Sequence, residues 1–213
     1  YLQYIWNKYP DTYKLIKKKD NKKNNLLFYL IKYDQKSVEK ILQSPLGKMK
    51  LLVHRNIKNM NCYLQACKYN GNLINILLNL EFTTNDMLYF GHMDYGSCLT
   101  LASRYQPIAV KHILNWEKLD WKLVKTLYEK NNFLTIAAKY NADAVKYALE
   151  SNLDLYDLIY CNTDETPFLN GCRYNPEVVK YLLDSKYESL TLILTKVGEK
   201  TYLEEAYDNQ PKA

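Results

Sequence analysis

The feature that most constrains this chain is a dipeptide, a basic residue followed by tyrosine, that recurs at nearly constant intervals. Its five copies are Lys32-Tyr33, Lys68-Tyr69, Arg104-Tyr105, Lys139-Tyr140 and Arg173-Tyr174. Successive tyrosines lie 36, 36, 35 and 34 residues apart. A period of about 20–50 residues is typical of repeat proteins, in which each unit buries its apolar face against its neighbours. The chain is therefore predicted to be a row of similar units.

The residues around each dipeptide predict two helices per unit. Eight positions before the tyrosine stands a residue whose side chain can cap a helix N-terminus. These residues are Asn25, Asn61, Ser97, Asn132 and Thr166. After the tyrosine, a short turn leads to apolar residues spaced i, i+3, i+4, such as Val110, Ile113 and Leu114, which mark one face of a second helix. The connector between units holds a further apolar group, as in 121–124, which predicts a short helical turn; a hairpin finger is the alternative.

This pattern predicts a single all-α domain over residues 1–213. Six Gly and six Pro are few for a β-rich chain of this length, which supports the same class. About five full units are expected, near residues 25–60, 61–96, 97–131, 132–165 and 166–200. Partial units are expected at 1–24, as a second helix with its connector, and at 201–213, as the start of a first helix. The chain is accordingly expected to be a segment of a longer array.

Several of these segments are similar to the ankyrin repeat. Residues 164–168 (Asp-Glu-Thr-Pro-Phe) resemble the D-x-T-P-L entry into the first helix of that family, and 137–140 and 179–183 resemble its A-A-x-x and V-V-K-x-L-L segments. The turn between the helices is one residue shorter than usual, the characteristic His is absent, and the Gly-rich finger is mostly missing. The resemblance implies a curved solenoid of ankyrin type with a concave protein-binding face. The Asn/Lys/Tyr-rich composition resembles the ankyrin proteins of large DNA viruses of amoebae.

Charge and cysteine content narrow the environment and the partner. The formal charge is +6 and the pI is about 8.8, which favours an acidic partner but lies below the charge density of a dedicated DNA binder. Five cysteines without paired spacing predict free thiols and a reducing, intracellular compartment, most simply the cytoplasm, or the host cytoplasm for a viral protein. No stretch approaches the roughly 20 apolar residues of a membrane span, and the first residues do not resemble a signal peptide.

The sequence offers no recognisable catalytic, cofactor or metal motif. His54, His92 and His112 lie outside any triad or metal context, and Cys62 and Cys67 are five apart, which does not place both sulfurs on one helix face. Phosphate-binding Gly loops are absent. We therefore expect a non-enzymatic protein without cofactor or metal.

The repeated dipeptides are the candidate partner-binding residues. In the ankyrin family, positions near the end of the first helix line the concave groove, which would place the five cations and five tyrosines of the dipeptides in one row. Arg and Tyr are typical binding anchors, and a row of cations favours an acidic or polar protein segment. Alternatively, the tyrosines only pack over the neighbouring unit. A further alternative is single-stranded nucleic acid, with one base stacked on each Tyr.

Two other basic groups have simpler explanations. The run Lys17-Lys18-Lys19 with Lys22 and Lys23 is expected to be a solvated loop, or else a nuclear-import or nucleic-acid patch. Lys111, Lys146 and Lys180 fall on the second helices, which form the convex back in the ankyrin family, and are expected to aid solubility.

Overall fold

The computed structural model describes residues 16–43, 49–89, 96–161, 165–187 and 193–209. Within these ranges the chain is mostly α-helical, and its one two-stranded sheet pairs β1 (Lys196–Val197) with β2 (Lys200–Thr201). The prediction of an all-α fold is confirmed. The expected second helix of the partial unit at the front, and most of its connector, fall in residues 1–15, outside the described ranges.

The first helix of each pair ends in the repeated dipeptide. We call these five the inner helices: α3 (Leu26–Tyr33), α6 (Cys62–Tyr69), α9 (Cys98–Tyr105), α12 (Phe133–Tyr140) and α15 (Pro167–Tyr174). Each follows its predicted N-cap residue, and four of the caps accept a hydrogen bond from a backbone N–H three residues on. Asn25 is the exception, because its Oδ1 accepts no bond from its helix. Its amide donates to Leu51 O (3.1 Å), as those of Asn61 and Asn132 donate to Met87 O and Leu158 O.

The second helices follow after a single residue. These outer helices are α4 (Gln35–Gln43), α7 (Gly71–Leu78), α10 (Pro107–Leu114), α13 (Ala142–Leu149) and α16 (Pro176–Leu183). The linking residue has an extended φ between −141° and −159°, which reverses the chain within one position. Polar side chains at this link also cap the outer helix: Asn70 accepts from Leu73 N, and Asp34 accepts from Ser37 N (3.1 Å).

The connectors contain both of the structures considered from the sequence. Short helices α5 (Met49–Leu52), α11 (Trp121–Val124) and α14 (Tyr156–Ile159) occur where apolar groups predicted them, and α8 (Asn85–Tyr89) occurs where none was predicted. Tyr128 and Asn131 close a hairpin with a two-residue loop, through two backbone hydrogen bonds of 2.8 and 2.9 Å. Its central residues, Glu129 and Lys130, both have positive φ, as in the tight turns that suit β-hairpins.

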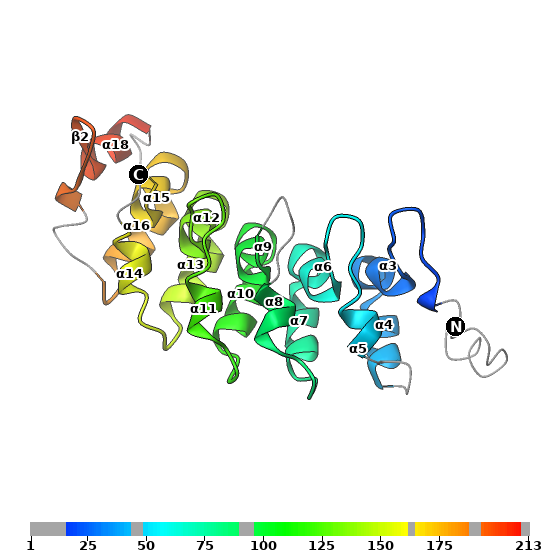
Figure 1. Cartoon of the computed structure of the whole chain (residues 1–213). Helices are drawn as coiled ribbons and strands as arrows, with labels where there is room; N and C mark the ends of the chain where they lie inside the picture. Colours follow the sequence, from blue (N-terminus) through cyan, green and yellow to red (C-terminus); the bar gives the residue numbers. More distant parts are fainter. Residues whose placement is uncertain (1–15, 44–48, 90–95, 162–164, 188–192, 210–213) are drawn as a thin grey trace.

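The pairs stack side by side into a curved row, with the inner helices on the inner side of the bend (Figure 1). Neighbouring inner helices pack on each other, and so do the outer helices from α7 to α16. One continuous core runs through the row and includes Leu64 of an inner helix, Ile74 of an outer helix and Leu88 of a connector, all fully buried. Burial of each such side chain contributes about 1.5–3 kcal/mol, so each unit depends on its neighbours for most of its stability.

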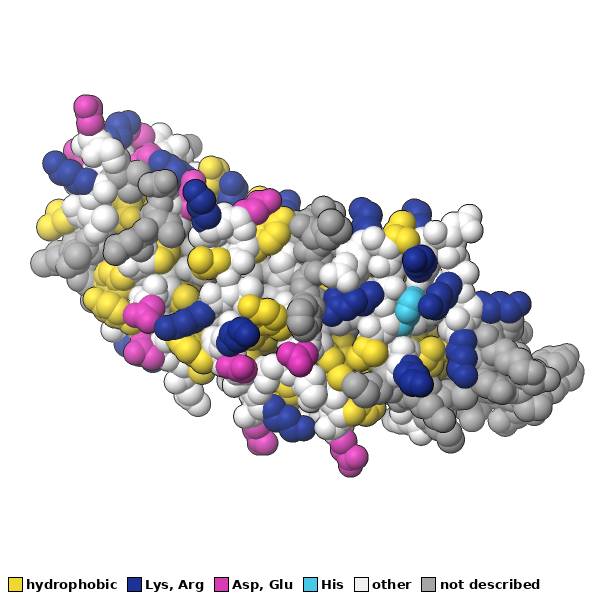
Figure 2. All heavy atoms as spheres, viewed as in Figure 1, with side chains coloured by type: hydrophobic (Ala, Val, Ile, Leu, Met, Phe, Trp, Pro, Cys, Tyr) yellow, Lys and Arg dark blue, Asp and Glu magenta, His cyan; other side chains and the backbone are white. Residues whose placement is uncertain are grey.

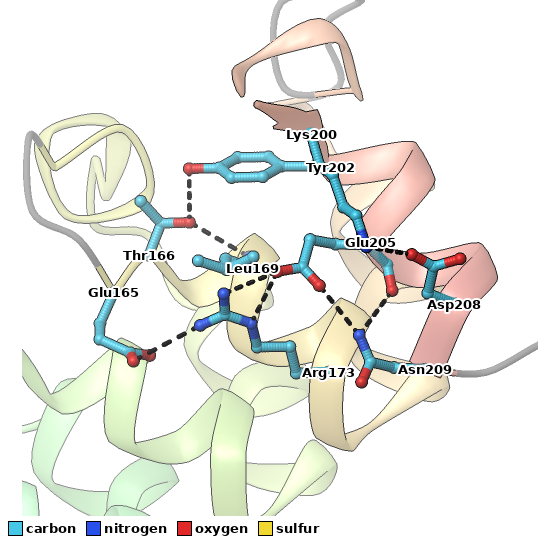
Figure 3. A network of polar contacts seen from close by, with 9 residues as sticks. All are labelled: Glu165, Thr166, Leu169, Arg173, Lys200, Tyr202, Glu205, Asp208 and Asn209. Carbon is cyan, nitrogen blue, oxygen red and sulfur yellow. Dashed lines mark hydrogen bonds and ion pairs between the residues drawn. The ribbon is translucent and has the colours of Figure 1, made fainter. Parts of the chain in front are cut away.

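A further helix, α18 (Tyr202–Asn209), continues the inner row and packs against α15. It follows the hairpin β1–β2, and its first residue, Tyr202, is buried beside Phe168 with ring centroids 5.6 Å apart. The hydroxyl of Thr166, the cap of α15, donates to the Tyr202 hydroxyl oxygen (3.0 Å; Figure 3). The helix lies where the sequence register places the start of a further unit.

Candidate binding surface

The ten candidate residues occupy the last two positions of the five inner helices. Because these helices pack side by side in register, the dipeptides form one row along the inner surface, which we call the ladder. Four of its tyrosines are exposed, from 37% at Tyr69 to 71% at Tyr33, whereas Tyr105 is half-buried against the core. The structure thus brings together in one row the residues that the sequence singled out.

Within the ladder, cations and rings alternate. Each of the first four cations lies over the ring of its own tyrosine and over the ring of the next unit. The cation-to-centroid distances to the next ring are 4.9 Å for Lys32–Tyr69, 5.5 Å for Lys68–Tyr105, 4.4 Å for Arg104–Tyr140 and 4.8 Å for Lys139–Tyr174. Contacts of this kind contribute about 0.5–1 kcal/mol at exposed sites. The ladder therefore joins adjacent units as well as forming a surface.

The fifth cation, Arg173, has a different environment. In the next unit the register places Asp208 and Asn209 where a basic residue and tyrosine would stand, so no further ring follows. The Arg173 guanidinium instead donates to Glu205 Oε1 of α18 from Nη2 (2.7 Å) and Nε (3.2 Å), and a second carboxylate, Glu165, lies 3.6 Å from Nη1 (Figure 3). A ladder cation thus binds carboxylates where no tyrosine ring of a following unit lies next to it.

The cations at the two ends of the ladder have raised pKa values. Hydrogen bonding to Glu205 is the main reason that the pKa of Arg173 is raised, and hydrogen bonding to Arg173 lowers the pKa of Glu205. At the other end of the row, interaction with the Tyr33 hydroxyl raises the pKa of Lys32. Both cations therefore stay charged throughout the physiological pH range.

Two hollows open beside the ladder. The N-terminal hollow, about 330 Å³, lies between α3, α6 and the loops around Lys22 and Lys58, and Lys32 and Lys68 border it. The central hollow, about 200 Å³, is bordered by Arg104 and Lys139. Its other lining residues include Leu101, Ile136 and Asn170 from the inner helices, the hairpin at Tyr128 and the carboxylates Glu129 and Glu165.

Polar residues at one position of the inner helices connect the units, which sequence reasoning missed. Four positions after the cap, Gln65 donates to Phe28 O (3.0 Å) and Asn170 donates to Thr135 O (3.3 Å), both in the preceding unit. The Oδ1 atom of Asn170 is buried without a partner. A polar residue amid the buried face of these two helices was the available signal.

The remaining candidates lie elsewhere. Lys111, Lys146 and Lys180 are exposed on outer helices, away from the ladder. The five cysteines are free thiols, and all but Cys161 are buried. In the described ranges, no three His, Cys, Asp or Glu side chains gather as a metal site, and each helix there is too short or too polar to span a lipid bilayer.

Comparisons with known proteins find the fold but no family. No protein-family model matches the chain, and no curated protein matches it. Among solved structures, the chain is similar to a chain in the structure described as Bd0816 predatory endopeptidase from Bdellovibrio bacteriovorus in complex with immunity protein Bd3460. The TM-score is 0.62 and the identity 17%, over 92% of this chain and 95% of the matched chain. At this identity the likeness concerns the fold.

This match corrects the prediction that the chain is not an enzyme. The prediction depended on the absence of familiar motifs, and the structure that shares the fold belongs to an endopeptidase complex. Catalytic groups are brought together by folding and need no local sequence motif, and a fold by itself neither names nor excludes an activity. The exclusion of an enzyme is therefore withdrawn.

Proposed function

We propose that this chain is a protein-interaction scaffold of the ankyrin type, which binds an acidic or polar segment of a partner protein along the ladder. The observation that carries the proposal is the continuous row from Lys32 to Tyr174, flanked by two hollows. Large aromatic and cationic side chains on a rigid scaffold are typical of binding anchors. The contact between Arg173 and Glu205 illustrates the carboxylate chemistry that such a row can use.

The structural comparison supports the same proposal at the level of the fold. The similar chain belongs to a complex between two proteins, an endopeptidase and an immunity protein. A row of helix pairs presents a long surface whose side chains can vary without disturbing the core, which suits it to protein recognition.

Affinity capture with two matched triple variants tests the proposal. The ladder variant replaces Lys68, Arg104 and Lys139 by Gln. The control replaces the exposed Lys111, Lys146 and Lys180 of the outer helices by Gln, so that both variants lose three positive charges. Each must retain the circular dichroism spectrum of the parent. The proposal predicts that a saturable partner captured by the parent and the control is lost from the ladder variant. Equal capture by all three proteins would refute it.

The comparison also favours a second candidate, a peptidase-related function, because the matched structure contains an endopeptidase. Hydrolysis of a pool of quenched fluorescent peptides by the purified chain tests this candidate. Turnover that copurifies with the chain and persists in the control variant would support it, whereas a rate equal to that of buffer would refute peptidase activity.

A further inference from the structure

The positive charge of this protein is concentrated in its N-terminal third. Residues 1–69 carry fifteen Lys and Arg against four Asp and Glu, whereas residues 70–213 carry fourteen against nineteen. The overall +6 is therefore the difference between a strongly basic segment and a mildly acidic one. Figure 2 shows Lys and Arg side chains gathered over the N-terminal end of the visible face, with Asp and Glu further along the row.

The N-terminal hollow is more basic than the central one. Four lysines line it, Lys22, Lys32, Lys58 and Lys68, and the described residues of its lining include no carboxylate. Among the described residues, no Asp or Glu forms an ion pair with Lys22, Lys32 or Lys58. The central hollow differs, because its two cations share their surroundings with Glu129 and Glu165.

The loops that carry Lys22 and Lys58 are held in place. The Asp20 carboxylate accepts bonds from the Tyr29 hydroxyl (2.5 Å) and from the backbone N–H of Lys22 (2.9 Å), which occupies this acid in shaping the first loop. Asn56 Oδ1 accepts from Lys58 N (2.9 Å) in the second loop. Ile57 N donates to Lys22 O (3.0 Å), which ties the two loops together. The backbone that carries Lys22 and Lys58 is therefore preorganised, which reduces the entropy that the two loops lose on binding.

The Tyr69 ring of this hollow already carries two cations. Lys32 lies over it at 4.9 Å and Lys68 at 5.4 Å, and Lys32 also lies over Tyr33 (4.8 Å). Because base stacking needs an open ring face, the contacts at Tyr69 favour a ligand that uses charge and hydrogen bonds. A polypeptide with clustered carboxylates has that chemistry.

From these observations we infer that the N-terminal hollow is the acid-binding end of the ladder: a partner lies along the row with its cluster of Asp or Glu over Lys22, Lys32, Lys58 and Lys68. Less acidic residues of the same partner then face the central hollow. This inference rests on the proposed function and deepens it, since it sets the direction and the chemistry of the bound segment.

Fluorescence anisotropy with a labelled peptide of alternating Glu and Gly tests the inference, with the Gln and Gly peptide as the neutral comparison. The variant Lys22→Gln/Lys58→Gln removes two charges from the hollow without changing the ladder. The control Lys36→Gln/Lys40→Gln removes two exposed charges from α4, outside the lining of the hollow. We expect the affinity for the Glu peptide to fall about tenfold in the first variant and less than about twofold in the control.

Other outcomes would overturn the inference. Equal losses in both variants would mean that only net charge matters, and equal binding of the Glu and Gln peptides would exclude carboxylate recognition. Binding of labelled oligothymidine more tightly than the Glu peptide, lost in the first variant, would assign the hollow to nucleic acid. The proposed function is tested separately, because Lys22 and Lys58 are outside the ladder: a partner captured through the ladder while this peptide test fails would refute only the inference.

Discussion

If the ladder joins adjacent units, replacing one residue of a cation–ring contact should lower the free energy of unfolding. The loss should be smaller when the other residue of that contact has already been replaced. Arg104 is the best site, since its guanidinium lies 4.4 Å from the Tyr140 ring and 5.4 Å from the Tyr105 ring. At about 0.5–1 kcal/mol for each contact, the change Arg104→Gln should lower the free energy of unfolding by about 1–2 kcal/mol. The change Tyr140→Leu removes the stronger contact and also the one from Lys139 at 5.7 Å.

A double-mutant cycle isolates the contact between Arg104 and Tyr140. The free energies of unfolding of the parent, Arg104→Gln, Tyr140→Leu and the double variant are measured by urea denaturation followed by far-ultraviolet circular dichroism. We expect a coupling energy of about 0.5–1 kcal/mol, with unchanged dependence on urea concentration. Lys146→Gln, an exposed change on α13, serves as the control and should alter stability by less than about 0.5 kcal/mol. Additive effects of Arg104→Gln and Tyr140→Leu would refute the coupling of adjacent units through this ladder contact.

Three further predictions concern backbone strain, pH and thiol reactivity. The change Gly96→Ala should lower the free energy of unfolding, measured by chemical denaturation, by about 1–3 kcal/mol, because φ is +71° and the new Cβ would lie 2.7 Å from Thr100 Oγ1. The change Gly198→Ala should lower it less, because φ is similar (+66°) but no heavy atom lies within 4 Å of the new Cβ. The reverse order would contradict this prediction. The pKa of Glu205 is lowered mainly by its hydrogen bond to Arg173. The stabilisation from Glu205 is therefore complete above its usual pKa of 4.5 and is lost as the pH falls through its lower pKa in the folded state. The free energy of unfolding, measured against pH, should lose this acid-side dependence in Glu205→Gln, and identical profiles for parent and variant would refute the assignment. A thiol reagent should modify the partly exposed Cys161 before Cys62, whose pKa is raised by complete burial, and mass spectrometry showing the opposite order would contradict the described burial.

The helix pairs could be predicted because local rules and packing agree. The cap residues Asn61, Ser97, Asn132 and Thr166 satisfy backbone N–H groups within their own helix, so their signal is contained in a few neighbouring residues. The apolar stripes give the second helix by the same logic. Asn25 shows the limit, because it stands at the same position and its amide likewise donates to the following connector, yet its Oδ1 makes no cap bond.

Features that depend on contacts between units could not be predicted. One repeat period after Tyr174 the sequence has Asn209 and no tyrosine. The sequence alone nevertheless did not show that Arg173 would form an ion pair with Glu205. The hairpin at Tyr128 depends on positive φ at Glu129 and Lys130, residue types that do not favour that conformation. The basic hollow brings Lys22 and Lys58 together through loops of two different units. The candidate surface was therefore predicted as a row on a concave face, but the hollows and loops beside it were not predicted.

The most direct test of the binding proposal is site-specific photo-crosslinking of the partner. A photoreactive phenylalanine analogue is placed at Tyr33, which ends an inner helix and is 71% exposed, and in a second protein at Lys146 on the outer helix α13. The account predicts that the captured partner crosslinks at position 33, that the crosslinked peptide is rich in Asp or Glu, and that position 146 gives no product. Crosslinking at position 146 alone would contradict the account and place the binding surface on the outer helices.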